Sequence, residues 1–226
     1  MKAVAILVAA GRGARMGSDK LFLKVAGKPV IAHTWGRFDK MEGIDEIIIV
    51  VRAGMSRKFT AIATKFQFKK KYQIVTGGAE RQDSVWNGLK VVPEDAEIVV
   101  IHDAARPCVN EELIATTIKF ADETGAAVAA HPVTDTIKES ADGRLIQHTL
   151  DRSKLWAVET PQTFRLGVIR RAIEVARSRN MLFTDDTAAC ELIGQPVRLV
   201  SSIAPNPKVT VPGDLPFVEV LLNQSS

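Results

Sequence analysis

Residues 3–16 read AVAILVAAGRGARM, an apolar run followed at once by a glycine-rich loop with two arginines. The apolar part, Ala3–Val8, has the length and continuous hydrophobicity of a buried parallel β-strand. In the loop, glycines let backbone N–H groups approach an anion closely, and the arginines, with Lys20 just beyond, supply positive charge. A strand that runs into such a loop predicts an α/β fold with a polyphosphate site at its first turn.

Two common phosphate-binding loops do not fit this stretch. The dinucleotide fingerprint G-x-G-x-x-G needs a glycine where Met16 stands, and no acidic residue ends the next strand-like run, Ile47–Val51, to bind a ribose. The P-loop pattern G-x-x-x-x-G-K-[ST] fails because neither Gly11 nor Gly13 begins its spacing. These mismatches disfavour a dehydrogenase and a P-loop enzyme, and an ordinary tight strand-to-helix turn stays open as the alternative to a functional loop.

Downstream of the loop, strand and helix patterns alternate, which predicts a Rossmann-like α/β fold: a mostly parallel twisted sheet with helices on both faces. The length of 226 residues suits a single domain over 1–226. Strands are expected at 47–51, 73–75, 98–101, 126–130 and 197–201, and helices at 29–41, 55–66, 81–91, 111–124, 166–179, 185–192 and from about 214.

The alternation breaks between about 132 and 161. This stretch holds short β-type runs around a turn at 141–144, which is typical of an extended hairpin that leaves the domain. Such an arm cannot bury its own faces, so it is expected to pack on a partner. The sequence thus predicts a β-arm that makes a homodimer.

Composition narrows the class of partner. The formal charge of +4 is mild, aromatic residues are few and no basic helix stands out, so nucleic acid is not expected. The first 28 residues nevertheless hold six Lys or Arg against one acid, which fits an anionic ligand near the amino terminus. No apolar run is long enough to span a membrane. Cys108 and Cys190 have neither metal spacing nor redox pairing, and are expected to be buried and reduced in a cytoplasmic protein.

Three polar segments follow predicted strands, at the place where open parallel sheets bind ligands. They are the opening loop, residues 77–84 (GGAERQDS) and residues 102–107 (HDAARP), and all three should converge on one crevice. Asp103 directly follows a strand, and its carboxylate suits Mg²⁺, which takes one or two carboxylates together with substrate phosphates. A turn or helix cap is the structural alternative for Asp103.

The remaining charged candidates each have a plain structural explanation as well. Lys20 and Lys208 follow loops and could simply be solvated. Arg106 could pair with Asp103 or hold a second anion. Thr184 opens a predicted helix, where an N-cap explains it equally well.

A series of short motifs runs along the chain: AAGxGxRM (9–16) with Lys20, RxDSV (81–85), HDAARP (102–107), DR (151–152), TPQ (160–162), TD (184–185) and KVT (208–210). Taken in order, these motifs resemble the 2-C-methyl-D-erythritol 4-phosphate cytidylyltransferase (IspD) family over nearly the whole chain. HDAARP, TPQ and KVT at these intervals are specific, whereas the opening loop alone fits many sugar-nucleotide pyrophosphorylases. Two details depart from many relatives: Asp-Lys-Leu stands at 19–21 in place of Pro-Lys-Gln, and Ala79 stands where some have Asp.

The resemblance implies a nucleotidyltransferase that joins CTP to 2-C-methyl-D-erythritol 4-phosphate and releases pyrophosphate, in the non-mevalonate route to isoprenoids. It implies a homodimer that uses Mg²⁺, with Asp103 near a metal held mainly by the CTP phosphates. It also assigns roles to residues. Catalysis falls to Arg15, Lys20 and Lys208; nucleotide binding to Ala9, Ala10, Gly11, Gly13, Gly78, Ser84, Asp103 and Ala104; and polyol phosphate binding to Asp103, Arg106 and Thr184, with Arg152 and Thr160 reaching a neighbouring subunit's pocket from the arm.

Two rival functions remain at this stage. A ribitol-5-phosphate cytidylyltransferase shares the opening loop and sheet, and both substrates are polyol phosphates. A catalytically idle nucleotide-binding protein on the same scaffold would be expected to lack Lys20, Asp103 or Lys208, and all three are present.

Overall fold

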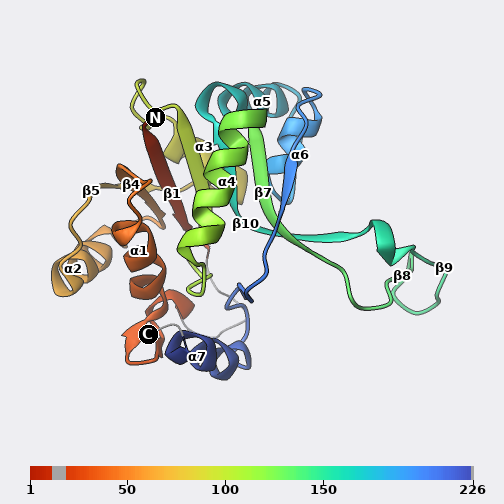
Figure 1. Cartoon of the computed structure of the whole chain (residues 1–226), viewed down its shortest axis with the longest axis horizontal. Coiled ribbons are helices and arrows are strands. Elements are labelled where there is room, and N and C mark those ends of the chain that lie inside the picture. Colours follow the sequence, from red (N-terminus) through yellow and green to blue (C-terminus); the bar gives the residue numbers. More distant parts are fainter. Residues whose placement is uncertain (12–18, 225–226) are drawn as a thin grey trace.

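A twisted seven-stranded sheet forms the centre of the computed structural model, which describes residues 1–11 and 19–224 (Figure 1). Its strand order is β11-β7-β10-β6-β1-β4-β5. The strands β6, β1, β4 and β5 are parallel neighbours, so their carboxyl ends share one edge. The seven strands are β1 (Ala3–Ala9), β4 (Glu46–Val51), β5 (Lys71–Thr76), β6 (Ile98–Asp103), β7 (Ala126–Pro132), β10 (Trp156–Arg165) and β11 (Arg198–Ser201).

Both faces of the central strands are buried, as the continuous apolar run at the start of the chain predicts. In β1, Ala5 and Leu7 pack into one core layer, and Val4 and Ile6 pack into the other. The first layer includes side chains of α1, α2, α4 and α7, and the second includes side chains of α3, α5 and α6. The helices are α1 (Val30–Lys40), α2 (Ser56–Phe66), α3 (Arg81–Leu89), α4 (Glu111–Thr124), α5 (Leu166–Ser178), α6 (Asp186–Glu191) and α7 (Asp214–Gln224).

The expected fold class is confirmed, and the helix ends follow local signals. Helix α4 begins after Asn110, whose side chain accepts a hydrogen bond from the N–H of Leu113, and ends at Gly125 with φ of 94°. A positive φ at this position favours glycine, because a side chain is strained there. Helix α6 begins after Asp185, which serves as its N-cap.

One strand of the sheet was not predicted. Strand β10 enters the sheet between β7 and β6 and is antiparallel to both. Its inner part, residues 162–165, reads QTFR and has no apolar run to mark it as a buried strand. The pairing with β6 and β7, which are far from it in sequence, makes it a strand.

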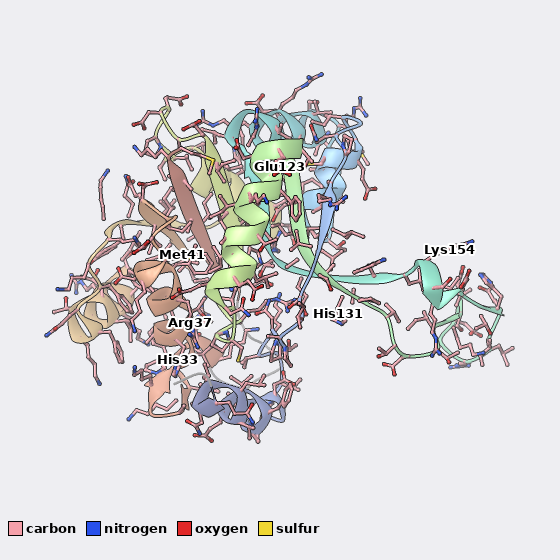
Figure 2. The ribbon with its side chains drawn as sticks, in the orientation of Figure 1. His33, Arg37, Met41, Glu123, His131 and Lys154 are labelled. Atoms are coloured by element: carbon pink, nitrogen blue, oxygen red, sulfur yellow. The ribbon has the colours of Figure 1, made fainter. Side chains whose placement is uncertain are left out.

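The expected arm projects away from the body of the molecule (Figure 1). It contains the short hairpin of β8 (Lys138–Glu139) and β9 (His148–Thr149), followed by the 3₁₀ turn η3 (Arg152–Lys154). His131 lies where the arm leaves the sheet, and Lys154 lies out on the arm (Figure 2). Leu145 and Ile146 near the hairpin turn are 74% and 65% exposed, so the arm has apolar surface available for a partner.

The sequence analysis did not predict the short secondary-structure elements that follow the opening loop. They are the 3₁₀ turn η2 (Lys20–Phe22) and the small hairpin of β2 (Lys24–Val25) and β3 (Lys28–Pro29). Cys190 is buried as expected, whereas Cys108 is only partly buried, and both are free thiols. No helix in the described part of the chain is long and apolar enough to cross a membrane.

Candidate active site

A cavity of about 640 Å³ opens at the carboxyl edge of the sheet, beyond the ends of β1, β4, β5 and β6. This is where open parallel sheets bind ligands. The three polar segments expected to converge do so as far as they are described, since Gly11, residues 77–81 and Asp103 all line it. The described lining is Val8, Ala9, Ala10, Gly11, Lys20, Leu21, Arg52, Ala53, Gly77, Gly78, Ala79, Glu80, Arg81, Ser84, Asp103, Ala105 and Lys208.

Two lysines from opposite ends of the sequence meet at this cavity. Lys20 Nζ donates a hydrogen bond of 2.7 Å to the carbonyl of Val209, the residue after Lys208. Lys208 in turn places its Nζ 2.7 Å from Oδ2 of Asp103. The predicted convergence of Lys20 and Lys208 on one site is confirmed. Gly13 and Arg15, predicted in the same place, lie outside the described residues.

Asp103 stands among three cations. Besides Lys208, Arg81 Nε lies 3.6 Å from Oδ1 and Arg106 Nε lies 3.7 Å from Oδ2. Burial by itself acts to raise the pKa of the Asp103 carboxyl, but the charges of Lys208, Arg81 and Arg106 outweigh it and hold that pKa well below its usual range. Asp103 is therefore a carboxylate at neutral pH.

Glycines at the end of β5 let the backbone come close to the cavity wall. A Cβ on Gly77 would lie 2.6 Å from Ala10 Cβ, and one on Gly78 would lie 2.2 Å from Asp83 Cβ. Ser84 Oγ accepts a 3.2 Å hydrogen bond from the Gly78 N–H. Any larger residue at 77 or 78 would push this turn and α3 apart.

Two arginines of the cavity were missed as candidates. Arg81, at the start of α3, was quoted as part of a motif but given no role; its Nη2 lies 2.8 Å from Oδ2 of the fully buried Asp186. Arg52, directly after β4, pairs with Asp19. Both follow a strand or a strand-end loop at the carboxyl edge, and that position was the available signal.

A buried network fixes the backbone of Asp103. The Thr160 hydroxyl accepts a 3.0 Å hydrogen bond from the Asp103 N–H and donates to His102 Nδ1. His102 Nε2 donates to the Arg106 carbonyl at 3.1 Å. Burial lowers the pKa of His102 to about 4, so its ring is neutral, as these contacts require.

The sequence model of the 2-C-methyl-D-erythritol 4-phosphate cytidylyltransferase (IspD) family matches residues 3–224. The chain belongs to this family. It is 42% identical to the enzyme of that name from Alkaliphilus oremlandii over 224 residues, which cover 98% of this chain and 95% of the relative. The relative of the same name from Caldanaerobacter subterraneus is 42% identical over 227 residues, which cover 99% and 100% of the two chains.

Solved structures of IspD enzymes share the fold. The 4-diphosphocytidyl-2C-methyl-D-erythritol synthase of Anaerococcus prevotii superposes with a TM-score of 0.87 at 29% identity, covering 98% of this chain and 96% of that one. The Thermus thermophilus cytidylyltransferase superposes with a TM-score of 0.81 at 30% identity, covering 99% and 100%. The family resemblance seen in the motifs is confirmed.

Two of the residues assigned from the family, Ala104 and Thr160, are buried in this structure, and their roles stay predictions. Ala104 is fully buried and outside the described lining; its N–H donates to the Val8 carbonyl and its carbonyl accepts from the Thr34 hydroxyl. The adjacent Ala105 lines the cavity instead. Thr160 lies in β10, inside the sheet of its own chain, and is 3% exposed.

Three other predicted residues lie away from the described lining. Arg106 is largely buried behind Asp103 and donates to the Asn206 carbonyl. Thr184 is exposed and precedes the N-cap of α6. Arg152 lies on the arm, where its side chain donates to the Thr134 carbonyl. Their assignment to the polyol phosphate stays a prediction.

The site fits a magnesium ion that arrives with a polyphosphate better than one held by the protein alone. Within residues 1–11 and 19–224 there is no group of three or more His, Cys, Asp or Glu side chains able to hold a metal. In the described lining the acidic residues are Glu80 and Asp103, and Asp103 is the one with cations beside it. One carboxylate plus substrate phosphates is a usual donor set for Mg²⁺.

Proposed function

We propose that the cavity at the carboxyl edge is where this cytidylyltransferase binds CTP and joins it to 2-C-methyl-D-erythritol 4-phosphate. The reaction gives 4-diphosphocytidyl-2-C-methyl-D-erythritol and pyrophosphate, a step of non-mevalonate isoprenoid biosynthesis. The observation that carries the assignment is the meeting of Lys20, Lys208 and Asp103 in one cavity beside a glycine turn.

The chemistry explains why the site is built from cations and has no catalytic triad. An oxygen of the phosphate monoester attacks the α-phosphorus of CTP, and the bond from that phosphorus to the bridging oxygen of pyrophosphate breaks. The monoester is already a nucleophile, so no strong base is needed, and the barrier is chiefly repulsion between anions and their alignment. Lys20 and Lys208 lower that repulsion by charge and by fixed position.

The glycine turn suits the nucleoside end of CTP. Because Gly77 and Gly78 carry no side chains, this turn packs closely on Ala10, Asp83 and Ser84 and presents backbone to the cavity, where a flat base could lie against it. The triphosphate then lies towards Lys20, Lys208 and the opening loop. This orientation places the α-phosphorus near Asp103 and its cations.

Mg²⁺ is proposed to enter with CTP. It would be held mainly by the triphosphate, with Asp103 as the protein carboxylate nearest to it, and when bound it neutralises charge on the phosphates. Lys208, paired with Asp103 in this structure, is partly exposed and would be able to turn to a phosphate if Asp103 held the metal.

We further propose a cytoplasmic homodimer made through the arm. The exposed apolar residues at the end of the arm, Leu145 and Ile146, need a partner surface, and Arg152 on the same arm would then reach the partner's polyol phosphate site.

A pyrophosphate-release assay tests the function. Purified protein is given CTP, UTP or ATP, each crossed with 2-C-methyl-D-erythritol 4-phosphate or ribitol 5-phosphate in the presence of Mg²⁺. We expect release with CTP and the methylerythritol phosphate and little with the other pairs. Faster release with ribitol 5-phosphate would support the rival substrate, and no release with any pair would refute the assignment.

A further inference from the structure

The sheet is interrupted where the arm joins it. Strand β10 pairs with β7 at Val158 and again at Gln162, opposite Ala130 and Val128. Three residues of β10, 159–161, therefore stand against a single residue of β7. Pairing with β6 begins only at Gln162. This bulge turns backbone and side-chain groups of Glu159 and Thr160 away from the regular ladder, which is a common use of bulges next to functional sites.

The side chain of Asn206 forms hydrogen bonds with two residues of this bulge. Its Nδ2 donates to Glu159 Oε2 at 3.0 Å and to the Thr160 carbonyl at 2.8 Å. The backbone carbonyl of Asn206 accepts a 2.7 Å hydrogen bond from Arg106 Nη1. Asn206 is 3% exposed and Glu159 8% exposed, so these are buried bonds whose loss leaves polar groups unpaired. Glu159 also lies 3.1 Å from Nδ1 of His131, at the root of the arm (Figure 2).

These bonds of Asn206 to Glu159 and Thr160, called the Asn206 clamp below, lie two residues before Lys208 of the cavity. Pro207, whose ring fixes its backbone angle, joins Asn206 to Lys208. On the other side, Val209 donates to the Ala105 carbonyl at 2.8 Å and accepts from Lys20. The backbone of Lys208 is thus held on both sides, by the bulge through Asn206 and by the cavity wall through Val209.

We propose that Asn206 is a positioning residue for the transfer reaction: by binding Glu159 and the Thr160 carbonyl it holds the backbone from which Lys208 reaches the phosphates. Asn206 is outside the described lining of the cavity, so it acts through Lys208. The inference rests on the proposed function, since it needs Lys208 to act on substrate. It also joins the root of the arm to the active site through one buried side chain.

The physical reason is the length of a lysine side chain. Four flexible methylenes give the ammonium a wide reach, and only a fixed backbone confines it to the volume beside the α-phosphate. Displacements of about 1 Å at a reacting centre can cost about a hundredfold in rate.

A double-mutant cycle tests the proposal. Asn206→Ala, Lys208→Ala and the double variant are compared with the unchanged protein for kcat and for KM of CTP and of the methylerythritol phosphate. We expect Asn206→Ala to lower kcat by about tenfold to a hundredfold, with KM for CTP changed less than about threefold. In the Lys208→Ala background the same change should cost less than about threefold, because its partner is already gone.

An equal cost in both backgrounds would show a general structural role and overturn the proposal. Full activity of Lys208→Ala would instead refute the proposed function, so the two failures are distinguishable. Asn110→Ala is the matched control: it removes the N-cap bond of α4 and should lower the melting temperature without lowering kcat.

If Asn206→Ala does not fold, the proposal is tested with Asn206→Asp, which keeps the size of the side chain. Asn206→Asp sets a carboxylate against Glu159 and the Thr160 carbonyl and should lower kcat. Adding Glu159→Gln returns a donor to the pair and should recover at least about threefold of that loss. No recovery in a folded double variant would count against the clamp.

Discussion

At the scale of single residues, neighbouring charges and burial set the protonation states of the ionisable groups in the site. The cations beside Asp103 lower its pKa and keep it ionised, while burial keeps His102 neutral, with a pKa of about 4. A neutral His102 can both accept from Thr160 and donate to the Arg106 carbonyl, so it serves as a rigid spacer beside the carboxylate. Lys20 and Lys208, bonded here to the Val209 carbonyl and to Asp103, are the cations proposed to act on the substrate.

Lys20→Ala is expected to lower turnover about a hundredfold or more, because it removes a positive charge from beside the reacting phosphates. The measurement is steady-state pyrophosphate release with CTP and the methylerythritol phosphate. Lys24→Ala is the control, since Lys24 is an exposed neighbour on β2 and should keep normal turnover. Near-normal turnover of Lys20→Ala would refute its catalytic role.

At the scale of elements, the close approach of α3 to the sheet sets the cavity wall. A Cβ on Gly88 would lie 2.9 Å from Ile6 Cγ2 and 3.1 Å from Val50 Cγ2, both on central strands. Helix α3 can lie this close only without a side chain there, and the residues at its start, Arg81 and Ser84, reach the cavity as a result.

Gly88→Ala is expected to destabilise the fold by about 1–3 kcal/mol, because the added methyl group overpacks the space between α3 and the sheet. Gly167→Ala is the matched control: this glycine is exposed in α5, with nothing within 4 Å of the added Cβ, and the change should stabilise by up to about 1 kcal/mol. Urea unfolding of both variants measures the difference, and equal stability of the two would contradict this account of the packing.

At the scale of the whole molecule, the arm is the part that projects from the body and leaves apolar side chains exposed (Figure 1). It carries Arg152 and these exposed apolar residues, while Lys20 and Lys208 line the cavity at the sheet edge of the same chain. In the proposed dimer, each active site combines the sheet edge of one chain with the arm of the other. A substitution at the sheet edge and a substitution on the arm can then be complemented by mixing the two variants.

Mixing Lys20→Ala and Arg152→Ala protein, each inactive, should restore about a quarter of normal activity after subunit exchange, since half of the dimers then hold one intact site of two. Pyrophosphate release is the readout. Mixing Lys20→Ala with Lys208→Ala should restore nothing, because both lysines line the same chain's cavity. Equal recovery in the two mixtures, or none in the first, would contradict a shared site.

Two things could be read from the amino-acid sequence alone: the helices and strands that have local sequence signals, and the family to which the chain belongs. Neighbouring residues in the chain set the buried run of β1, the caps of α4 and the helical periodicities. The motifs identified the IspD family because their residue types and spacing are specific. Tertiary structure alone decided the rest. Strand β10 exists because it pairs with distant β6 and β7, and Thr160 is a buried hydrogen-bonding residue because a bulge turns it inward. Ala105 rather than Ala104 lines the cavity, and Arg81 and Arg52 line it too, because contacts between segments far apart in the chain decide which groups face a cavity. No local sequence pattern records those contacts.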